Sequence, residues 1–260
     1  MVSEASSSSA PDLAAEVRGV AMRFGANTVF ENVSFDVRRG EVFVILGGSG
    51  CGKSTLLKLM IGLRRPSAGQ ILILGEDIHA LSGEARRRLL RRFGVMFQQG
   101  ALFGSMSVLE NVMLPLVTFT RLPREAIERV ARIKLGQVGL ADAAGRMPAQ
   151  LSGGMIKRAA IARAMALDPP LVFLDEPSAG LDPITSAGLD ALIVSLARDL
   201  GTTFVIVTHE LASIMAVADR VIMLDKQAKG IIAEGDPRRL KEESAHPVVR
   251  AFFQRTEMPA

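Results

Sequence analysis

Four short segments of the chain are apolar at every position and do not alternate with polar residues. They are Val42–Leu46, Leu171–Leu174, Phe204–Val207 and Val221–Leu224. Strands of a parallel sheet show this pattern because helices or other layers cover both faces of the sheet. Helical patterns separate the four segments, as crossovers between parallel strands require. The pattern therefore predicts an α/β fold with a parallel sheet at its centre.

The stretch between Gln98 and Pro169 has no apolar strand pattern. We therefore expect residues from about 100 to 168 to form a helical subdomain inserted into a main domain at 16–235. Two short helices are expected in a C-terminal extension at 236–260. Residues 1–15 contain four consecutive serines and lack the basic and apolar regions of a signal peptide, so a disordered tail is expected there.

A glycine-rich loop follows the first apolar segment, and an apolar helix, Thr55–Ile61, is expected after it. The loop fits the pattern G-x-x-x-x-G-K-[ST] and consists of Gly47, Gly48, Ser49, Gly50, Cys51, Gly52, Lys53, Ser54 and Thr55. Its glycines let backbone N–H groups surround phosphates, while the lysine reaches the β- and γ-phosphates and the serine reaches Mg²⁺. The strand before and the helix after argue against an ordinary turn, so the loop predicts binding of ATP and Mg²⁺.

Two carboxylates, Asp175 and Glu176, end the second apolar segment. Ligands of open parallel sheets bind at the carboxyl ends of the strands. We expect Asp175 to hold Mg²⁺, directly or through water, and Glu176 to take a proton from the attacking water. The plain alternative is a pair of acids that caps the next helix.

Together with the segment Leu151–Met155, which reads Leu-Ser-Gly-Gly-Met, these motifs resemble the ABC ATPase family over roughly Glu16 to Phe253. The resemblance implies a P-loop NTPase with a RecA-like parallel core, an inserted helical subdomain and an N-terminal antiparallel β-subdomain. The antiparallel layer would use Val17–Met22, Val33–Val37 and Ile71–Leu74. The family also implies two copies of the chain, because the signature segment of one copy caps the ATP held by the other.

The same resemblance assigns further roles. Phe24 stacks on adenine, Gln98 links Mg²⁺ to the permease contact, and His209 is the switch histidine. Ser152, Gly153 and Gly154 bind the phosphates, and Asp182 ends the D-loop that starts at Ser178. The expected catalytic residues are therefore Glu176, His209, Lys53 and Gln98, and the expected metal ligands are Ser54, Gln98 and Asp175. Without the family, Phe24 reads equally as a core residue and His209 as a histidine at a strand end.

Three local segments look like the Mla/Mce lipid-transport ATPases within this family: Met96–Phe103, the methionine at the end of Leu151–Met155, and Leu181–Thr185. This branch implies an integral membrane permease, an Mce-type substrate-binding protein and, in some systems, a small STAS-type regulatory subunit. It also implies a location on the cytoplasmic face of the inner membrane. The apolar tip Gly100–Phe103 is expected to pack on the permease, or else to fill the core of the helical subdomain.

Composition and charge reduce the number of possible functions further. No stretch approaches 18 uninterrupted apolar residues, so no spanning helix is expected. Aromatic residues make up 5% of the chain and no motif that reads DNA or RNA occurs, which argues against a nucleic-acid partner. The basic block Arg86–Arg92 is expected to be a solvated helix face, with attraction to an anionic membrane as the alternative. Cys51 is the only cysteine, and its place at a helix N-terminus favours the thiolate.

Two alternatives to lipid transport stay open at this point. The first is an ATPase subunit of an ABC transporter for another solute, which would use the same chemistry. The second is an ABC ATPase that works without a permease, which the apolar tip Gly100–Phe103 disfavours.

Overall fold

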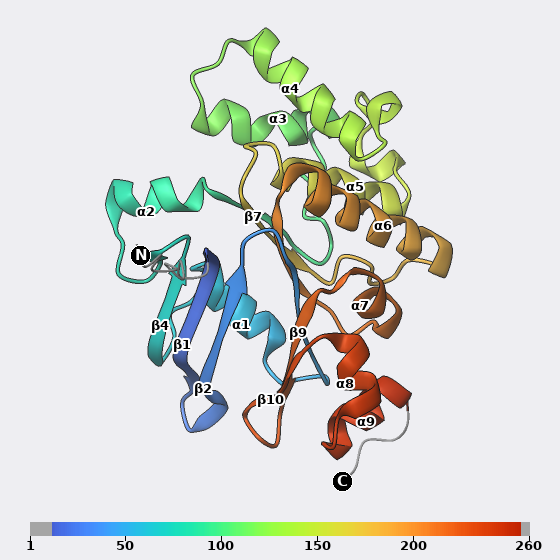
Figure 1. Ribbon diagram of the computed structural model, residues 1–260. Coiled ribbons are helices and arrows are strands. Elements are labelled where there is room, and N and C mark those ends of the chain that lie inside the picture. The colour runs from blue at the N-terminus through green and yellow to red at the C-terminus, as the bar shows by residue number, and fades with distance from the viewer. Residues whose placement is uncertain (1–11, 256–260) are drawn as a thin grey trace, which may run out of the picture.

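The computed structural model describes residues 12–255 as an α/β molecule with two sheets, in which helices lie between the sheets as well as beyond the larger sheet (Figure 1). An antiparallel sheet has the strand order β2-β1-β4-β5, and a six-stranded sheet has the order β10-β9-β3-β8-β7-β6. In the larger sheet, the five strands from β9 to β6 run parallel and β10 pairs antiparallel with β9. This confirms the predicted α/β class and parallel core.

The strands are β1 Leu13–Phe24, β2 Asn27–Arg38, β3 Val42–Gly47, β4 Ala68–Ile73, β5 Glu76–Asp77, β6 Phe93–Met96, β7 Leu171–Asp175, β8 Thr203–Val207, β9 Arg220–Asp225 and β10 Gly230–Gly235. The helices are α1 Lys53–Met60, α2 Gly83–Leu90, α3 Val108–Phe119, α4 Arg124–Gln137, α5 Gly153–Ala164, α6 Pro183–Leu200, α7 Leu211–Val217, α8 Pro237–Glu243 and α9 Pro247–Gln254. Two short 3₁₀ turns, Ala141–Ala143 and Pro148–Gln150, lie between α4 and α5.

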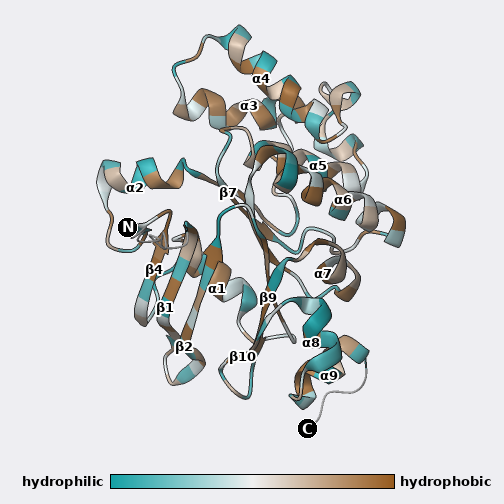
Figure 2. Cartoon of the chain, in the orientation of Figure 1, coloured by the Kyte–Doolittle hydropathy of each residue, from teal (hydrophilic) through white to brown (hydrophobic). Residues whose placement is uncertain are grey.

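The central strands are buried on both faces, and this explains their uninterrupted apolar sequences. In β3, Val42, Val44 and Leu46 belong to a core shared with α3 to α7 and α9. The alternate residues Phe43 and Ile45 belong to a second core shared with α1 and the antiparallel sheet. Figure 2 shows the resulting hydrophobic colouring of the central strands and more hydrophilic residues along outer helices such as α8.

Some boundaries differ from the sequence-based expectation. Residues 13–15, which we assigned to the disordered tail, form the start of β1, and the rest of that tail up to residue 11 lies outside the described residues. Two strands, β6 and β10, had no clear signal because each is short and contains glycine. Gly94 in β6 is needed for close packing, since a Cβ there would lie 2.1 Å from the carbonyl oxygen of Ala164 in α5.

The stretch from residue 97 to residue 170 contains no strand, and α3, α4 and α5 account for its helices. Helices α3 and α4 lie at the top of the molecule in Figure 1, and α8 and α9 lie at the opposite end. The boundaries between domains remain predictions. Within residues 12–255, no helix combines the length and the hydropathy that crossing a membrane requires.

The block of arginines on α2 is mostly engaged in local contacts. Arg86 donates to the carbonyl oxygens of Ile78 and Gly62, and Arg87 pairs with Glu84. Arg92 pairs with Glu76, while the guanidinium of Arg91 lies 5.2 Å from the ring centre of Phe119. These partners fit a solvated helix face with structural contacts.

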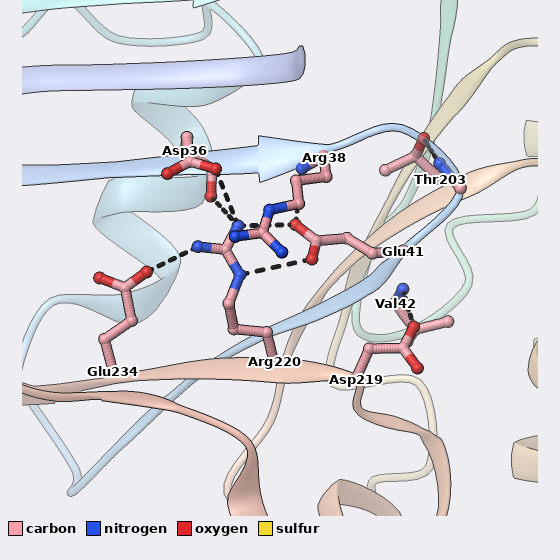
Figure 3. Close-up of polar contacts among 9 residues, drawn as sticks. Asp36, Arg38, Glu41, Val42, Thr203, Asp219, Arg220 and Glu234 are labelled. Atoms are coloured by element: carbon pink, nitrogen blue, oxygen red, sulfur yellow. Dashed lines mark hydrogen bonds and ion pairs between the residues drawn. The ribbon is translucent and has the colours of Figure 1, made fainter. Parts of the chain in front are cut away.

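Arg220 joins the two sheets through a network of carboxylates (Figure 3). Its guanidinium donates to Asp36 on β2 at 2.7 and 3.0 Å, to Glu41 at 2.9 Å and to Glu234 on β10 at 2.6 Å. It also lies 5.0 Å above the ring of Phe43. Burial opposes the charge, but the carboxylates of Glu41 and Asp36 outweigh this effect and raise the pKa of Arg220. The network fixes how the antiparallel sheet sits on the larger one.

We predict that Arg220→Met lowers the free energy of unfolding by about 3 kcal/mol or more, because Glu41, with 10% of its side chain exposed, would stay buried without a partner. Urea unfolding followed by circular dichroism measures the change. The control Arg239→Met removes an exposed pair with Glu243 and should cost less than about 0.5 kcal/mol. Equal losses in the two variants would contradict the special role of Arg220.

Candidate active site

The phosphate loop lies between the buried strand β3 and helix α1, as predicted. Gly47, Gly50 and Gly52 have φ values of 149°, 76° and 104°, which favour glycine. A Cβ on Gly47 would lie 2.3 Å from the carbonyl oxygen of Leu224, so there is also no space for a side chain. Ser49, Gly50 and Ser54 are exposed on the outer side of the loop. The backbone is therefore already folded into a turn that is open to an anion.

Lys53 points back over this loop. Its ammonium group donates to the carbonyl oxygens of Gly47 at 2.8 Å and Gly48 at 3.0 Å, and the residue is only 9% exposed. The positive charge is thus held beside the glycine backbone where phosphates are expected to bind. Thr55 follows in the first turn of α1 and is half-buried.

The burial of Cys51 contradicts the expectation that its thiol is a thiolate. The residue is 1% exposed and packs in the core that includes Phe30, Leu56 and Ile45. Burial is the main reason that the pKa of the Cys51 thiol is raised, although the nearby Lys53 lowers it. The expected thiolate is therefore wrong, since the effect of burial exceeds that of the nearby charge. Cys51 belongs to the loop through its backbone only.

The two acids at the end of β7 are buried without complete hydrogen bonding. Asp175 and Glu176 are each 8% exposed, and Asp175 Oδ1 and Glu176 Oε2 have no hydrogen-bond partner among the described residues. Burial, followed by repulsion from Glu176, raises the pKa of Asp175. Such buried oxygens are costly unless a ligand uses them. They do not act as a helix cap, which was the plain alternative, because the next helix is capped by Asp182.

Glu176 is held in an unusual backbone conformation beside His209. Its φ is +48°, and its backbone N–H donates to the carbonyl oxygen of Val207 in the neighbouring strand at 2.8 Å. His209 Nδ1 lies 2.8 Å from Glu176 Oε1. The left-handed conformation of a non-glycine residue is the kind of strain that gathers at functional sites. The structure thus brings together the predicted catalytic glutamate and the predicted switch histidine.

Gln98 follows β6, the strand next to β7, and its side chain is exposed. The backbone carbonyl oxygen of Gln98 accepts a hydrogen bond from Lys157, a buried residue of α5. Lys157 also donates to the carbonyl oxygen of Glu176 at 3.0 Å. Sequence reasoning missed Lys157, although a signal exists. Lys157 lies in the apolar stripe of α5 between Gly154 and Ile161, and a charge on such a stripe is rarely accidental.

The signature residues lie at the exposed start of α5. Ser152 caps the helix by accepting a hydrogen bond from the backbone N–H of Met155 at 3.3 Å, and Ser152 and Gly153 are exposed. Gly154 lies against α6, since a Cβ there would lie 2.4 Å from Thr185 Cγ2. No hydrogen bond joins Ser152–Gly154 to the phosphate loop within the described residues. The signature segment is therefore free to meet another molecule.

Asp182 and Phe24 have structural contacts of their own. Asp182 caps α6 by accepting hydrogen bonds from the N–H groups of Ile184 at 3.1 Å and Thr185 at 3.0 Å. The hydroxyl of Thr185 and these N–H groups lower the pKa of Asp182. Phe24 ends β1 with 43% exposure, and the guanidinium of Arg64 lies 4.8 Å from its ring centre. Phe24 is thus an exposed aromatic surface and not a core residue.

Comparison with known proteins agrees with this arrangement. Residues 30–179 match the ABC transporter family. The chain belongs to that family. Its relatives include the intermembrane phospholipid transport system ATP-binding protein MlaF of Escherichia coli K12, which is 42% identical and covers 92% of this chain and 87% of that protein. The probable ribonucleotide transport ATP-binding protein mkl of Mycobacterium leprae is also 42% identical and covers 93% of this chain and 69% of that protein.

Among solved structures, the dimeric ATP-binding cassette MJ0796, in a post-hydrolysis state bound to ADP and Pi, matches with a TM-score of 0.77. It is 31% identical and covers 85% of this chain and 98% of that chain. The predicted fold and the resemblance to the ABC ATPases are confirmed, and the chain is an ATPase subunit that binds nucleotide. The roles of individual site residues remain predictions.

We predict that Cys51 reacts with iodoacetamide at pH 8 at least about ten-fold more slowly in the folded protein than in urea, because burial removes access and disfavours the thiolate. Mass spectrometry over time measures both rates. Similar rates in the two conditions would mean that the thiol faces the open side of the loop.

Proposed function

We propose that the chain binds and hydrolyses ATP, with Mg²⁺, as the motor subunit of a phospholipid transporter. The proposal of hydrolysis rests on one observation: the phosphate loop and the Glu176–His209 pair follow strands of the same parallel sheet. The lipid substrate is supported by the 42% identity to MlaF over 92% of the chain. In this proposal the subunit works on the cytoplasmic face of the inner membrane, attached to an integral permease.

The donor set around Asp175 fits Mg²⁺. This ion prefers oxygen ligands and is usually bound by one or two carboxylates together with substrate phosphates. Ser54 is exposed at the loop, and Asp175 has a buried oxygen without a partner. Within residues 12–255 no cluster of three or more His, Cys, Asp or Glu side chains could hold a metal without other ligands. Ser54, Asp175 and Gln98 would therefore share Mg²⁺ with ATP, and the ion would offset the charge of the phosphates.

Different residues of the chain then bind the phosphates, accept the proton and contact the adenine. Lys53 and the N–H groups of the loop bind the phosphates, and the two loop carbonyls leave one N–H group of Lys53 for a phosphate oxygen. Glu176 Oε2 is buried without a hydrogen-bond partner and would accept the proton of the attacking water, while Oε1 lies beside His209. The exposed ring of Phe24 offers a flat surface for adenine.

A second copy of the chain completes the site. Ser152 and Gly153 are exposed and make no hydrogen bond to the phosphate loop of the same chain. A symmetric dimer would place each signature segment over the ATP bound by the other copy. The dimeric state of the related cassette MJ0796 supports this arrangement.

The permease would bind near the apolar tip Gly100–Phe103. A cleft of about 510 Å³ lies beside the tip and is lined by Leu90, Phe97, Phe103, Leu114 and Phe119, among others. Leu102 packs against the main core, whereas Phe103 is 51% exposed. Leu102 packs on the core and Phe103 lines the cleft, so we propose that Phe103 is the residue of the tip that contacts the permease. An exposed aromatic ring beside an apolar cleft fits a helix from a membrane partner.

An Mce-type binding protein and a small STAS-type subunit are further partners that we propose from the Mla/Mce resemblance. The names of the two relatives differ on the transported substrate, since MlaF is named for phospholipid and mkl for ribonucleotide transport. The experiments therefore have to separate the ATPase chemistry from the substrate.

For the chemistry, we predict that Glu176→Gln binds MgATP but hydrolyses it at least about 100-fold more slowly, because an amide cannot accept the proton. The closed dimer should accumulate. Lys53→Ala should lose nucleotide affinity and should not form this dimer. Size-exclusion chromatography with and without MgATP, together with phosphate release, measures both variants.

Glu243→Gln makes the same chemical change on the exposed surface of α8 and should behave as the wild type in these assays. Hydrolysis at the wild-type rate in Glu176→Gln would remove this residue from the role of base. Failure of this variant to dimerise with ATP, alone or on its permease, would contradict the shared site.

For the substrate, we predict that the subunit and its permease, purified together and reconstituted in vesicles, move a fluorescent phospholipid when MgATP is present. Phe103→Ala should keep the ATPase rate of the isolated subunit and lower transport several-fold. Leu200→Ala removes an exposed apolar side chain at the end of α6 and serves as the control. Uptake of a labelled ribonucleotide without phospholipid transfer would contradict the lipid substrate.

A further inference from the structure

Three cations of α5 bind backbone carbonyl groups of other segments. Arg158 donates to the carbonyl oxygens of Val138 at 3.3 Å and Gly188 at 3.1 Å. Arg163 donates to those of Gly100 and Ala101, each at 2.8 Å. Lys157 donates to those of Gln98 and Glu176. Helix α5 is therefore connected by charged hydrogen bonds to several segments of the fold.

Lys157 is the member of this set that reaches the hydrolysis site. Gln98 and Glu176 follow the adjacent strands β6 and β7, and one ammonium group bridges their carbonyl oxygens. Lys157 is 6% exposed, so water cannot easily replace the two bonds. Charged hydrogen bonds in buried surroundings are among the stronger ones and fix the geometry of both partners. Lys157 thereby fixes the backbone of Glu176 relative to α5.

The same helix carries the signature segment. Ser152 caps α5, and Lys157 lies five residues further on, which is about 7.5 Å along a helix. Arg163 adds the bonds to Gly100 and Ala101, so residues 98–101 and α5 are held together at three carbonyl groups. A small displacement of the exposed end of α5 would therefore also move the backbone of Gln98 and Glu176.

We propose that Lys157 is a positioning residue that makes the two ATP sites of the dimer depend on each other. This inference rests on the proposed two-copy site. The start of α5 meets the ATP of the partner copy, whereas Glu176 acts on the ATP of its own copy. Lys157 joins these two groups within one chain. Contact with ATP at one site thus sets the position of the base at the other site.

The first test compares substitutions at Lys157. Lys157→Met keeps the length of the side chain but cannot bridge the carbonyl groups, so kcat for ATP should fall at least about ten-fold. The Kd of MgATP for the isolated subunit should stay within about two-fold, because the phosphate loop is untouched. Lys157→Arg keeps the charge and the donors and should recover most of the rate.

Lys134→Met is the matched control. Lys134 is another buried lysine of the helical region, 4% exposed, and it pairs with Asp168, which precedes β7, whereas Asp175 and Glu176 lie at the other end of that strand. For each variant, the loss of kcat is compared with the fall in melting temperature. If both variants lose kcat in proportion to stability, Lys157 is only structural and the inference is overturned.

The decisive test uses mixed dimers, purified through two different tags and assembled on the permease. A dimer of one wild-type and one Lys157→Met copy should hydrolyse ATP at a rate near that of the double variant, well below half of the wild-type rate. A rate midway between the two pure dimers would show that each Lys157 serves only its own site, which overturns the inference. The mixed dimer with Lys157→Arg should recover most of the wild-type rate.

If Lys157→Met does not fold, Lys157→Gln replaces it, because glutamine retains one donor group, and the same comparison with the midway rate applies. The wild type separates the two proposals. A wild-type protein that hydrolyses ATP without forming a dimer overturns both the shared site and the coupling. A wild-type dimer that is active while the mixed dimer shows the midway rate overturns the coupling alone.

Discussion

The burial of the large sheet on both faces is the constraint on which the site depends. Apolar side chains occupy both sides of β3, β7 and β8, so polar groups find room only where these strands end. The phosphate loop follows β3, the acids Asp175 and Glu176 end β7, and His209 follows β8. Because the strands are parallel and adjacent, all of these groups meet at one edge. A sheet buried on both faces thus brings the polar groups of the site together at the carboxyl ends of its strands.

Where local pattern and environment agree, the sequence was sufficient to predict the structure. The four apolar runs became strands β3, β7, β8 and β9, and the loop and acids appeared at their ends. The resemblance to a known family was needed for His209 and Ser152, because one histidine or one serine carries no pattern. Strands β6 and β10 were not predicted, because the sequence of a short strand that contains glycine resembles that of a turn.

Properties that depend on packing could not be read from local sequence. The pKa of Cys51 follows from the core behind the loop and not from the helix N-terminus in front of it. The role of Lys157 depends on two carbonyl groups that are far away in the sequence. Arg220 likewise gathers partners from β2, β10 and the turn before β3. In each case the partners lie on other elements, and only the assembled fold identifies them.

The hydrogen bonds of Lys53 change how the loop's affinity for nucleotide is understood. Its ammonium group donates to the carbonyl oxygens of Gly47 and Gly48, so the loop's own lysine holds the turn in shape. A turn held by such hydrogen bonds loses conformational entropy during folding, which lowers the entropy cost of binding a ligand. Two of the three N–H groups of Lys53 have carbonyl partners, so the third is left for a phosphate oxygen in the proposed role of this lysine. In that role, the affinity for nucleotide depends on how one ammonium group is shared between carbonyl and phosphate oxygens.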